Sequence, residues 1–462
     1  MANDPPGPAP GLGPFDIGCL AVGGIIGVGI FFTPSKVAGR CDDAAQVVFA
    51  WGLGGVLAIL GGLVFAELAC RVKGHGGSFS YLHAAFGPLP AFLYGWANWL
   101  CIQAGAIGVV GIILVEYLDQ LLHGAARSTA GEKVAWAAVA IALFTLVNVI
   151  GLRVGKTVQN VLTVTKTLAV FSVVVIALFA GGKAAGQVTG FTTERRGWVE
   201  AIAGAILPVM FSFGGWQQAS FVAGAARKPL RDVPIGILGG VAVVVLAYVT
   251  VNLAFLNLLG FGGVSQSSSL GVDAARAAFG GEQAGEIAGR VLAAMIVISA
   301  GGIMNTICLA PPFVLHTMAR QGLFFAAVGR LHATRGVPTL AVLVQGTWSI
   351  LLLGITHVVA SVRGDAGAKD VLGFLLDGVV FVDWLFFALL GAALLRLRRL
   401  PLAQGFQAPG GGLVAVTFAL AGLAITAGAI AVSPQASLTG LLICALGWPF
   451  YAWMRRQEPD HG

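Results

Sequence analysis

The sequence predicts an all-α membrane protein with twelve transmembrane helices, and three observations lead to this fold class. Hydrophobic residues make up 57% of the 462 residues and charged residues only 10%, and the mean hydropathy is +0.88. Apolar windows of about 20 residues, the length that crosses a bilayer, recur along nearly the whole chain. Two of these windows, the first and the sixth, contain glycine-rich interruptions. The composition excludes a soluble enzyme.

The predicted spans follow one another with mostly short polar connections. They cover residues 15–39, 46–69, 90–118, 134–152, 157–181, 198–224, 233–259, 289–318, 338–358, 371–395, 411–432 and 436–454. The segment "FGGVSQSSSLG", residues 261–271, is rich in Gly and Ser and is predicted to be a flexible linker. Residues 1–14 contain no Lys or Arg, so we expect no cleavable secretory signal.

The distribution of charge predicts the orientation. Lys and Arg are more frequent at the span ends that share a side with the two termini, which predicts that both termini are cytoplasmic. The net charge of +7 then fits anionic lipid head groups rather than nucleic acid. Six cysteines are scattered without metal-ligand spacing, so we expect no metal site and no cofactor.

The two interruptions are the main functional signal. They read "GGIIGVGIFFTP", residues 23–34, and "FSFGGWQQASF", residues 211–221, five spans later. Paired broken helices are typical of inverted-repeat transporters, whose free amide N–H groups bind an anion and whose free carbonyls bind a cation. An amino acid zwitterion needs both. Glycines such as Gly23 and Gly27 also allow close helix packing, but the matching second interruption favours a site.

At these stretches the chain resembles the amino acid–polyamine–organocation superfamily, and within it the bacterial relatives of the L-type amino acid transporters. Further matching segments are "AELACRVKGHGGSFSYLHAAFGPLPAFLYGW", "VQNVLTVTKTLAV", "RKPLRDVP" and "MARQGLFF". The resemblance implies two inverted five-helix repeats, residues 15–181 and 198–395. Two further helices follow within 411–454, and residues 1–14 and 455–462 are cytoplasmic tails. It also implies alternating access to one central site.

The resemblance further implies how that site binds its substrate. The carboxylate would meet the backbone amides of Val28, Gly29 and Ile30. The ammonium would meet the carbonyls of Ile25, Phe211 and Gly214. Small residues at the breaks, among them Gly27, would leave room for the substrate. Gln217 and Asn305 are candidates for the side-chain end of the pocket, although each is equally suited to joining helices.

A lysine in the fifth span predicts the coupling mode. Lys166 lies about ten residues into an apolar helix, where a charged side chain is costly and faces the protein interior. The resemblance puts its ammonium where sodium-coupled relatives hold sodium, with Gly24 and Ser299 as expected neighbours, so sodium is not the expected coupling ion. Asp383, deep in the tenth span, is a candidate proton relay or partner of a buried polar group.

These observations predict a sodium-independent transporter of neutral L-amino acids, working as an exchanger or a proton symporter. A cationic amino acid or polyamine transporter of the same fold, or a non-transporting amino acid sensor, stays open as an alternative. The expected location is a bacterial cytoplasmic membrane. The predicted 3–4 loop, "EYLDQLLHGAARSTAGEK", lacks a cysteine, so no disulfide-linked heavy chain is expected. The sequence leaves open which amino acid is carried, the direction of transport, the oligomeric state, and whether Lys166 titrates.

Overall fold

The computed structural model is helical throughout its described part, which comprises residues 11–27, 29–123, 128–180, 197–267, 270–279, 282–363, 368–402 and 404–457. The helices of its N-terminal half are α1 (Pro14–Ile25), α2 (Gly29–Ala38), α3 (Ala44–Arg71), α4 (Ser78–Phe86), α5 (Pro88–Ala97), a π-helical turn η1 (Asn98–Gln103), α6 (Ala104–His123), α7 (Ala130–Ile150) and α8 (Leu152–Ala180).

The second half repeats the alternation of long and short helices. Its elements are α9 (Trp198–Phe213), α10 (Gln218–Phe221), a 3₁₀ turn η2 (Ala223–Ala225), α11 (Pro229–Gln266), α12 (Leu270–Phe279), α13 (Glu282–Leu309), α14 (Pro312–Arg320), a 3₁₀ turn η3 (Ala326–Gly329), α15 (Thr339–Arg363), α16 (Ala368–Leu397), α17 (Leu413–Val432) and α18 (Pro434–Gln457).

Ten helical segments of the described residues are long and apolar enough to cross a membrane. Two further apolar helices, α1 and α9, are shorter. They fall within the predicted spans 15–39 and 198–224, and each is followed within that range by a second short helix, α2 or α10. The prediction of an all-helical membrane fold is confirmed. The number of described helices that are long and apolar enough to cross a membrane is ten, whereas twelve spans were predicted.

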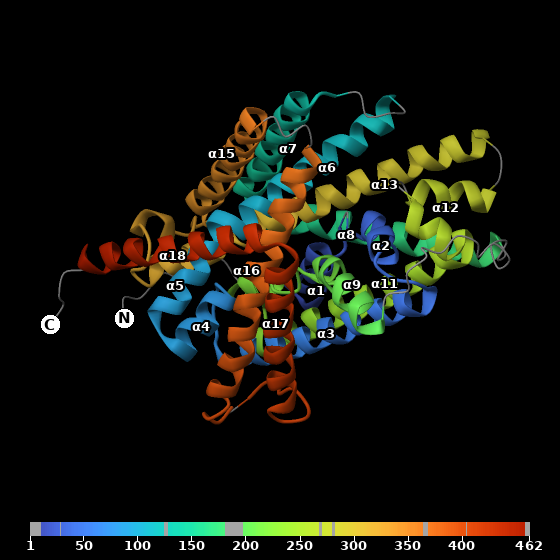
Figure 1. Cartoon of the computed structure of the whole chain (residues 1–462). Helices are drawn as coiled ribbons and strands as arrows, with labels where there is room; N and C mark the ends of the chain where they lie inside the picture. Colours follow the sequence, from blue (N-terminus) through green and yellow to red (C-terminus); the bar gives the residue numbers. More distant parts are fainter. Residues whose placement is uncertain are drawn as a thin grey trace.

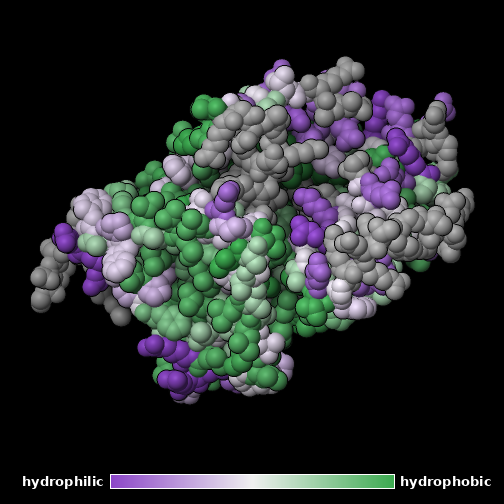
Figure 2. All heavy atoms as spheres, in the orientation of Figure 1, coloured by the Kyte–Doolittle hydropathy of each residue, from purple (hydrophilic) through white to green (hydrophobic). Residues whose placement is uncertain are grey.

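The interrupted helices lie at the centre of the molecule (Figure 1). Helix α1 packs against α11, α8 and α13, and α9 packs against α3 and α2. Helices α16 and α17 stand side by side near the C-terminal end of the chain (Figure 1). Figure 2 shows hydrophobic side chains over most of the face formed by these two helices, with hydrophilic residues gathered at their lower tips. Such an apolar outer face is typical of a protein surrounded by lipid.

The prediction of a flexible linker at residues 261–271 is wrong for most of these residues. Helix α11 continues to Gln266 beyond a kink at Gly260, whose φ is 68°, and α12 begins at Leu270. Leu270 and Val264 are buried, so this segment folds because its few apolar residues pack against the helices. Its Gly and Ser content alone did not indicate that contact.

Candidate functional site

The first interruption lies between Ile25, where α1 ends, and Gly29, where α2 begins. The end of a helix leaves its last carbonyls without intrahelical partners, and two remote side chains supply donors here. The Lys166 ammonium, on α8, donates to the carbonyl of Gly23 over 2.8 Å and also to the carbonyl of Ile26. The Tyr248 hydroxyl, on α11, donates to the carbonyl of Ile25 over 2.9 Å.

The second interruption lies between Phe213, where α9 ends, and Gln218, where α10 begins. Gly215 has a φ of +124°, a conformation that favours glycine. A Cβ atom there would lie only 2.3 Å from the carbonyl oxygen of Gly24, so the two interruptions touch through their backbones. The Gln217 side chain folds back, and its Oε1 accepts from the backbone N–H of Gly215 over 3.0 Å.

A cavity of about 100 Å³ opens between the two interruptions. Eight of the residues predicted for the site line it: Gly24, Ile25, Gly27, Gly29, Phe211, Gly214, Gln217 and Asp383. Its wall combines the amide end of α2, the carbonyl ends of α1 and α9, and apolar side chains of α13 and α16. Helix N-termini attract anions and helix C-termini attract cations, so the cavity can hold a small zwitterion.

The remaining predicted residues that the structure describes lie outside the cavity. Ile30 is fully buried in the hydrophobic core, and Val28 falls outside the described residues. Asn305 does not line the cavity. Its side chain accepts from Asn148 over 3.0 Å and donates to Gln159 over 2.9 Å, which joins α13 to α7 and α8. Of the two roles that the sequence left open for Asn305, this geometry supports the joining of helices.

The surroundings of Lys166 differ from the expectation in one respect. Its side chain is 1% exposed, and no described acid forms an ion pair with it. The acceptors are Gly23 and Ile26 rather than Gly24, because the Gly24 carbonyl faces Gly215 across the cavity wall. A Cβ atom on Gly302 would lie 3.2 Å from the ammonium. Ser299, one turn earlier on α13, is buried, and its hydroxyl bonds no described residue.

A chain of polar side chains, which the sequence did not reveal, runs from the π-helical turn to the cavity. The Tyr94 hydroxyl donates to Asn98 Oδ1 over 3.4 Å, and Gln103 Nε2 donates to the same oxygen over 2.9 Å. Gln218 Nε2 in turn donates to Gln103 Oε1 over 3.1 Å. Gln103 and Gln218 both line the cavity. The irregular turn brings Asn98 and Gln103 together, since side chains five residues apart do not meet on a regular α-helix.

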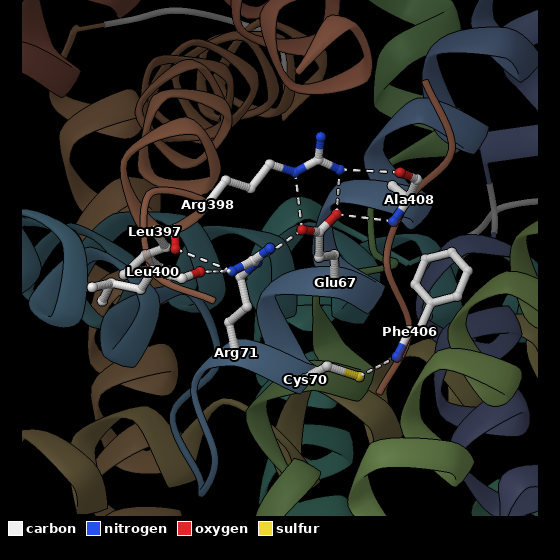
Figure 3. A network of polar contacts seen from close by, with 8 residues as sticks. All are labelled: Glu67, Cys70, Arg71, Leu397, Arg398, Leu400, Phe406 and Ala408. Carbon is white, nitrogen blue, oxygen red and sulfur yellow. Dashed lines mark hydrogen bonds and ion pairs between the residues drawn. The ribbon is translucent and has the colours of Figure 1, made fainter. Parts of the chain in front are cut away.

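A second polar cluster lies apart from the cavity, where α3 ends and the segment after α16 folds over it (Figure 3). The Glu67 carboxylate accepts from Arg71 Nε over 2.8 Å and from Arg398 Nε over 2.9 Å, and Arg398 Nη2 donates to its other oxygen. The backbone N–H of Ala408 also donates to Glu67, over 2.9 Å. Nearby, Cys70 Sγ accepts from the backbone N–H of Phe406 over 3.2 Å. This cluster ties two distant segments together.

Solved transporter structures share this fold. MhsT in complex with L-phenylalanine aligns with a TM-score of 0.58 at 16% identity, covering 93% of this chain and 98% of that one. MHP1, a nucleobase-cation-symport-1 family transporter in a closed conformation with bromovinylhydantoin bound, aligns with a TM-score of 0.55 at 15% identity, covering 99% and 97%. At such identities the likeness shows the fold alone.

The family assignment rests on a family model, and several sequence relatives agree with it. The b(0,+)-type amino acid transporter 1 of Mus musculus is 27% identical over 85% of this chain and 77% of its own length. The serine/threonine exchanger SteT of Bacillus subtilis (strain 168) is 28% identical over 73% and 75%, and the human cystine/glutamate transporter is 25% identical over 94% and 82%. The family model of the amino acid permeases matches residues 12–451. The chain therefore belongs to the amino acid permease family, and its function is amino acid transport rather than enzymatic catalysis.

Proposed function

We propose that this chain is a sodium-independent secondary transporter of neutral L-amino acids that works by alternating access, as an exchanger or a proton symporter. In this proposal α1 with α2, and α9 with α10, each form one interrupted span, which gives twelve spans. Two inverted five-helix halves, residues 15–181 and 198–395, then enclose the cavity. Helices within 411–454 follow them, and both termini lie on the cytoplasmic side of a bacterial cytoplasmic membrane.

The single observation that carries the coupling assignment is the position of the Lys166 ammonium. It donates to the carbonyls of Gly23 and Ile26 at the first interruption. Backbone carbonyls at an unwound helix are also the ligands that transporters use for sodium. A fixed ammonium satisfies these oxygens permanently, so the cycle needs no sodium ion. Proton symport and exchange both remain compatible with this arrangement.

The substrate assignment rests on the two ends of the cavity. The carboxylate of an amino acid would bind at the start of α2, near Gly29, and the ammonium near the carbonyls of Ile25 and Gly214. The Tyr248 hydroxyl already donates to the Ile25 carbonyl, but a carbonyl oxygen has two lone pairs and retains one for the substrate. The cationic alternative draws on Asp383, the one acid among the described residues that line the cavity.

We further propose that the chain transports without a second subunit. Animal L-type transporters attach to a heavy chain through a cysteine in the 3–4 loop, and this sequence has none there. All six cysteines are free, and Cys41, in the short connection between α2 and α3, is buried. Transport by the purified lone chain in proteoliposomes is therefore the expected result.

The proposal is tested by initial uptake of labelled amino acids into proteoliposomes in sodium, potassium or choline buffer at fixed ionic strength and pH. The wild type should transport equally well in all three. Lys166→Ala should lower uptake by roughly 10- to 100-fold, because two buried carbonyls lose their donor. Thr167→Ala is a matched control, since the Thr167 hydroxyl bonds only Thr163 of its own helix. A sodium-dependent wild type, or an unchanged rate in Lys166→Ala, would refute the coupling assignment.

A further inference from the structure

Three buried side-chain oxygen atoms in the cavity wall have no hydrogen-bond partner among the described residues. One is the hydroxyl of Ser212, on α9, which can donate as well as accept. The other two are acceptors, Oδ1 of Asp383, on α16, and Oε1 of Gln218, on α10. Nearly all buried polar atoms of folded proteins are paired, and an unpaired acceptor is costly. Two unpaired acceptors on one cavity point to a ligand that brings the donor.

The neighbouring hydrogen bonds orient the Gln218 amide. Its nitrogen donates to Gln103, which is held in turn by Asn98. With the nitrogen engaged on that side, the oxygen is the end of the amide without a partner. Asp383 forms no hydrogen bond or ion pair with a described residue, although it lies on a well-packed helix between Val382, which is fully buried, and Trp384, which is 2% exposed.

Most of the other residues that line the cavity are apolar. The other lining side chains of α13 and α16 are Ile303, Ile307, Val379, Val380, Trp384 and Phe387. A polar pair within such a wall discriminates strongly between ligands of equal shape, because a ligand without the donor leaves both acceptors unpaired. The helix ends that would bind the substrate backbone line the same cavity, so one small molecule can contact both regions.

We propose that Asp383 and Gln218 form a subsite that selects amino acids whose side chain carries a hydrogen-bond donor, as a hydroxyl or a carboxamide does. The inference rests on the proposed function, which puts the substrate backbone at the two helix interruptions. It defines the substrate class as neutral and polar. Apolar side chains of the same size are disfavoured, and acidic side chains are repelled by the carboxyl group of Asp383.

Isosteric substrate pairs provide the sharpest measurement. Threonine and valine have nearly the same shape, but only threonine carries a hydroxyl donor, and asparagine and leucine form a second pair. We expect the purified wild type in proteoliposomes to favour threonine over valine in kcat/KM by about tenfold or more. Asp383→Leu should lower this ratio at least about tenfold, because threonine transport loses more than valine transport does. Glu286→Gln, which changes an exposed acid, should keep the wild-type ratio.

Substrate binding is measured in parallel through the thermal stabilisation of the detergent-purified protein by threonine and by valine. Gln218→Met gives a second test if Asp383→Leu does not fold, and it should also lower the threonine preference. A preference for ornithine that Asp383→Asn removes would support the subsite and overturn the neutral assignment of the proposed function. Stabilisation by threonine in the wild type but not in Asp383→Leu, without uptake, would support the subsite and overturn the transport function.

Three results would overturn the inference. One is an equal threonine-to-valine ratio in the wild type and in Asp383→Leu. Another is an Asp383→Leu variant whose uptake depends differently on pH but whose threonine-to-valine ratio is unchanged. That result would mean that Asp383 only relays protons and does not select the substrate. The third is a wild type that neither amino acid of a pair stabilises and that transports neither, a result that also overturns the proposed function.

Discussion

Glu67 and Asp383 are both carboxyl groups on membrane-spanning helices, yet their surroundings are opposite. Glu67, near the end of α3, is fully buried and accepts four hydrogen bonds, from Arg71, twice from Arg398 and from the backbone of Ala408 (Figure 3). Four bonds approach the full acceptor capacity of a carboxylate. Asp383, in the middle of α16, accepts none from the described residues.

The difference separates a structural role from a functional one. Helix α16 runs from the cavity to the charged cluster, because Arg398 follows its last residue, Leu397, about 15 residues and roughly 22 Å beyond Asp383. At one end the helix is fixed by a buried carboxylate with a complete set of donors. At the cavity it presents a carboxyl group without any. A buried carboxylate with all its partners holds segments together, whereas a carboxyl oxygen without a partner at a cavity favours a ligand.

The largest expected effect is the loss of stability on removing the Glu67 carboxylate. Glu67→Ala leaves two partly buried guanidinium groups, Arg71 and Arg398, without their anion, which typically costs up to about 3–5 kcal/mol. The apparent melting temperature in detergent should fall by several degrees, and the residual threonine-to-valine ratio of the folded fraction should stay unchanged. Glu286→Ala, which removes an exposed partner of Arg290, is the control and should leave the melting temperature unchanged.

A melting temperature of Glu67→Ala equal to that of the wild type would contradict this prediction, because it would show that the cluster contributes little net stability. If Glu67→Ala does lower the melting temperature, the triple variant Glu67→Leu, Arg71→Met and Arg398→Met removes all three charges together. It should recover part of the loss, since buried ion pairs are often replaceable by apolar side chains of similar volume.

Much of the fold could be predicted from the sequence because lipid requires long apolar helices. The positions of both interruptions followed from glycines, and eight predicted residues line one cavity. The role of Lys166 as a donor to the first interruption was also predicted, although its acceptors are Gly23 and Ile26 rather than Gly24. Which backbone carbonyl faces the Lys166 side chain depends on how the end of α1 is rotated, and the sequence does not specify that rotation directly.

The partners of polar residues were the least predictable feature. Glu67 has one local partner, Arg71, four residues later, but its other partners, Arg398 and the backbone of Ala408, come from more than 300 residues away in sequence. Asn305 showed the same limit, since its bonds to Asn148 and Gln159 depend on how α13 packs against α7 and α8. Long-range pairing of polar groups is a property of tertiary packing and not of local pattern.

His75 is a titratable base that lies just after α3, at the same end of this helix as Glu67. Burial, together with the neighbouring His316, lowers the pKa of His75 to about 4. The unfolded chain therefore binds a proton near pH 6.5, but the folded protein binds it only near pH 4. Stability should fall as the pH decreases from about 6.5 to about 4, which is measurable as a decreasing apparent melting temperature.

His75→Phe is the matched variant because the His75 ring stacks on Phe313, with 4.7 Å between the ring centroids. Phenylalanine keeps this contact and does not titrate, so the melting temperature should depend less on pH between about 4 and 6.5. An unchanged pH dependence in His75→Phe would assign the effect to other groups. The expected change in melting temperature is smaller than that of Glu67→Ala. His75 is protonated gradually as the pH falls from about 6.5 to about 4, whereas Glu67→Ala removes the carboxylate at every pH.

The smallest expected effect on stability belongs to Asp383. Asp383→Leu removes a carboxyl group that no described residue pairs with, and replacing an unpaired polar group with an apolar one of similar shape is nearly neutral or stabilising. Without substrate, the apparent melting temperature should therefore match or exceed that of the wild type, in contrast to Glu67→Ala measured under the same conditions. Asp383→Asn, which keeps polar atoms at the same place, should gain less. A decrease as large as that of Glu67→Ala would mean that Asp383 is held by partners in the folded protein, and the contrast between a structural and a ligand-binding carboxyl group would then fail.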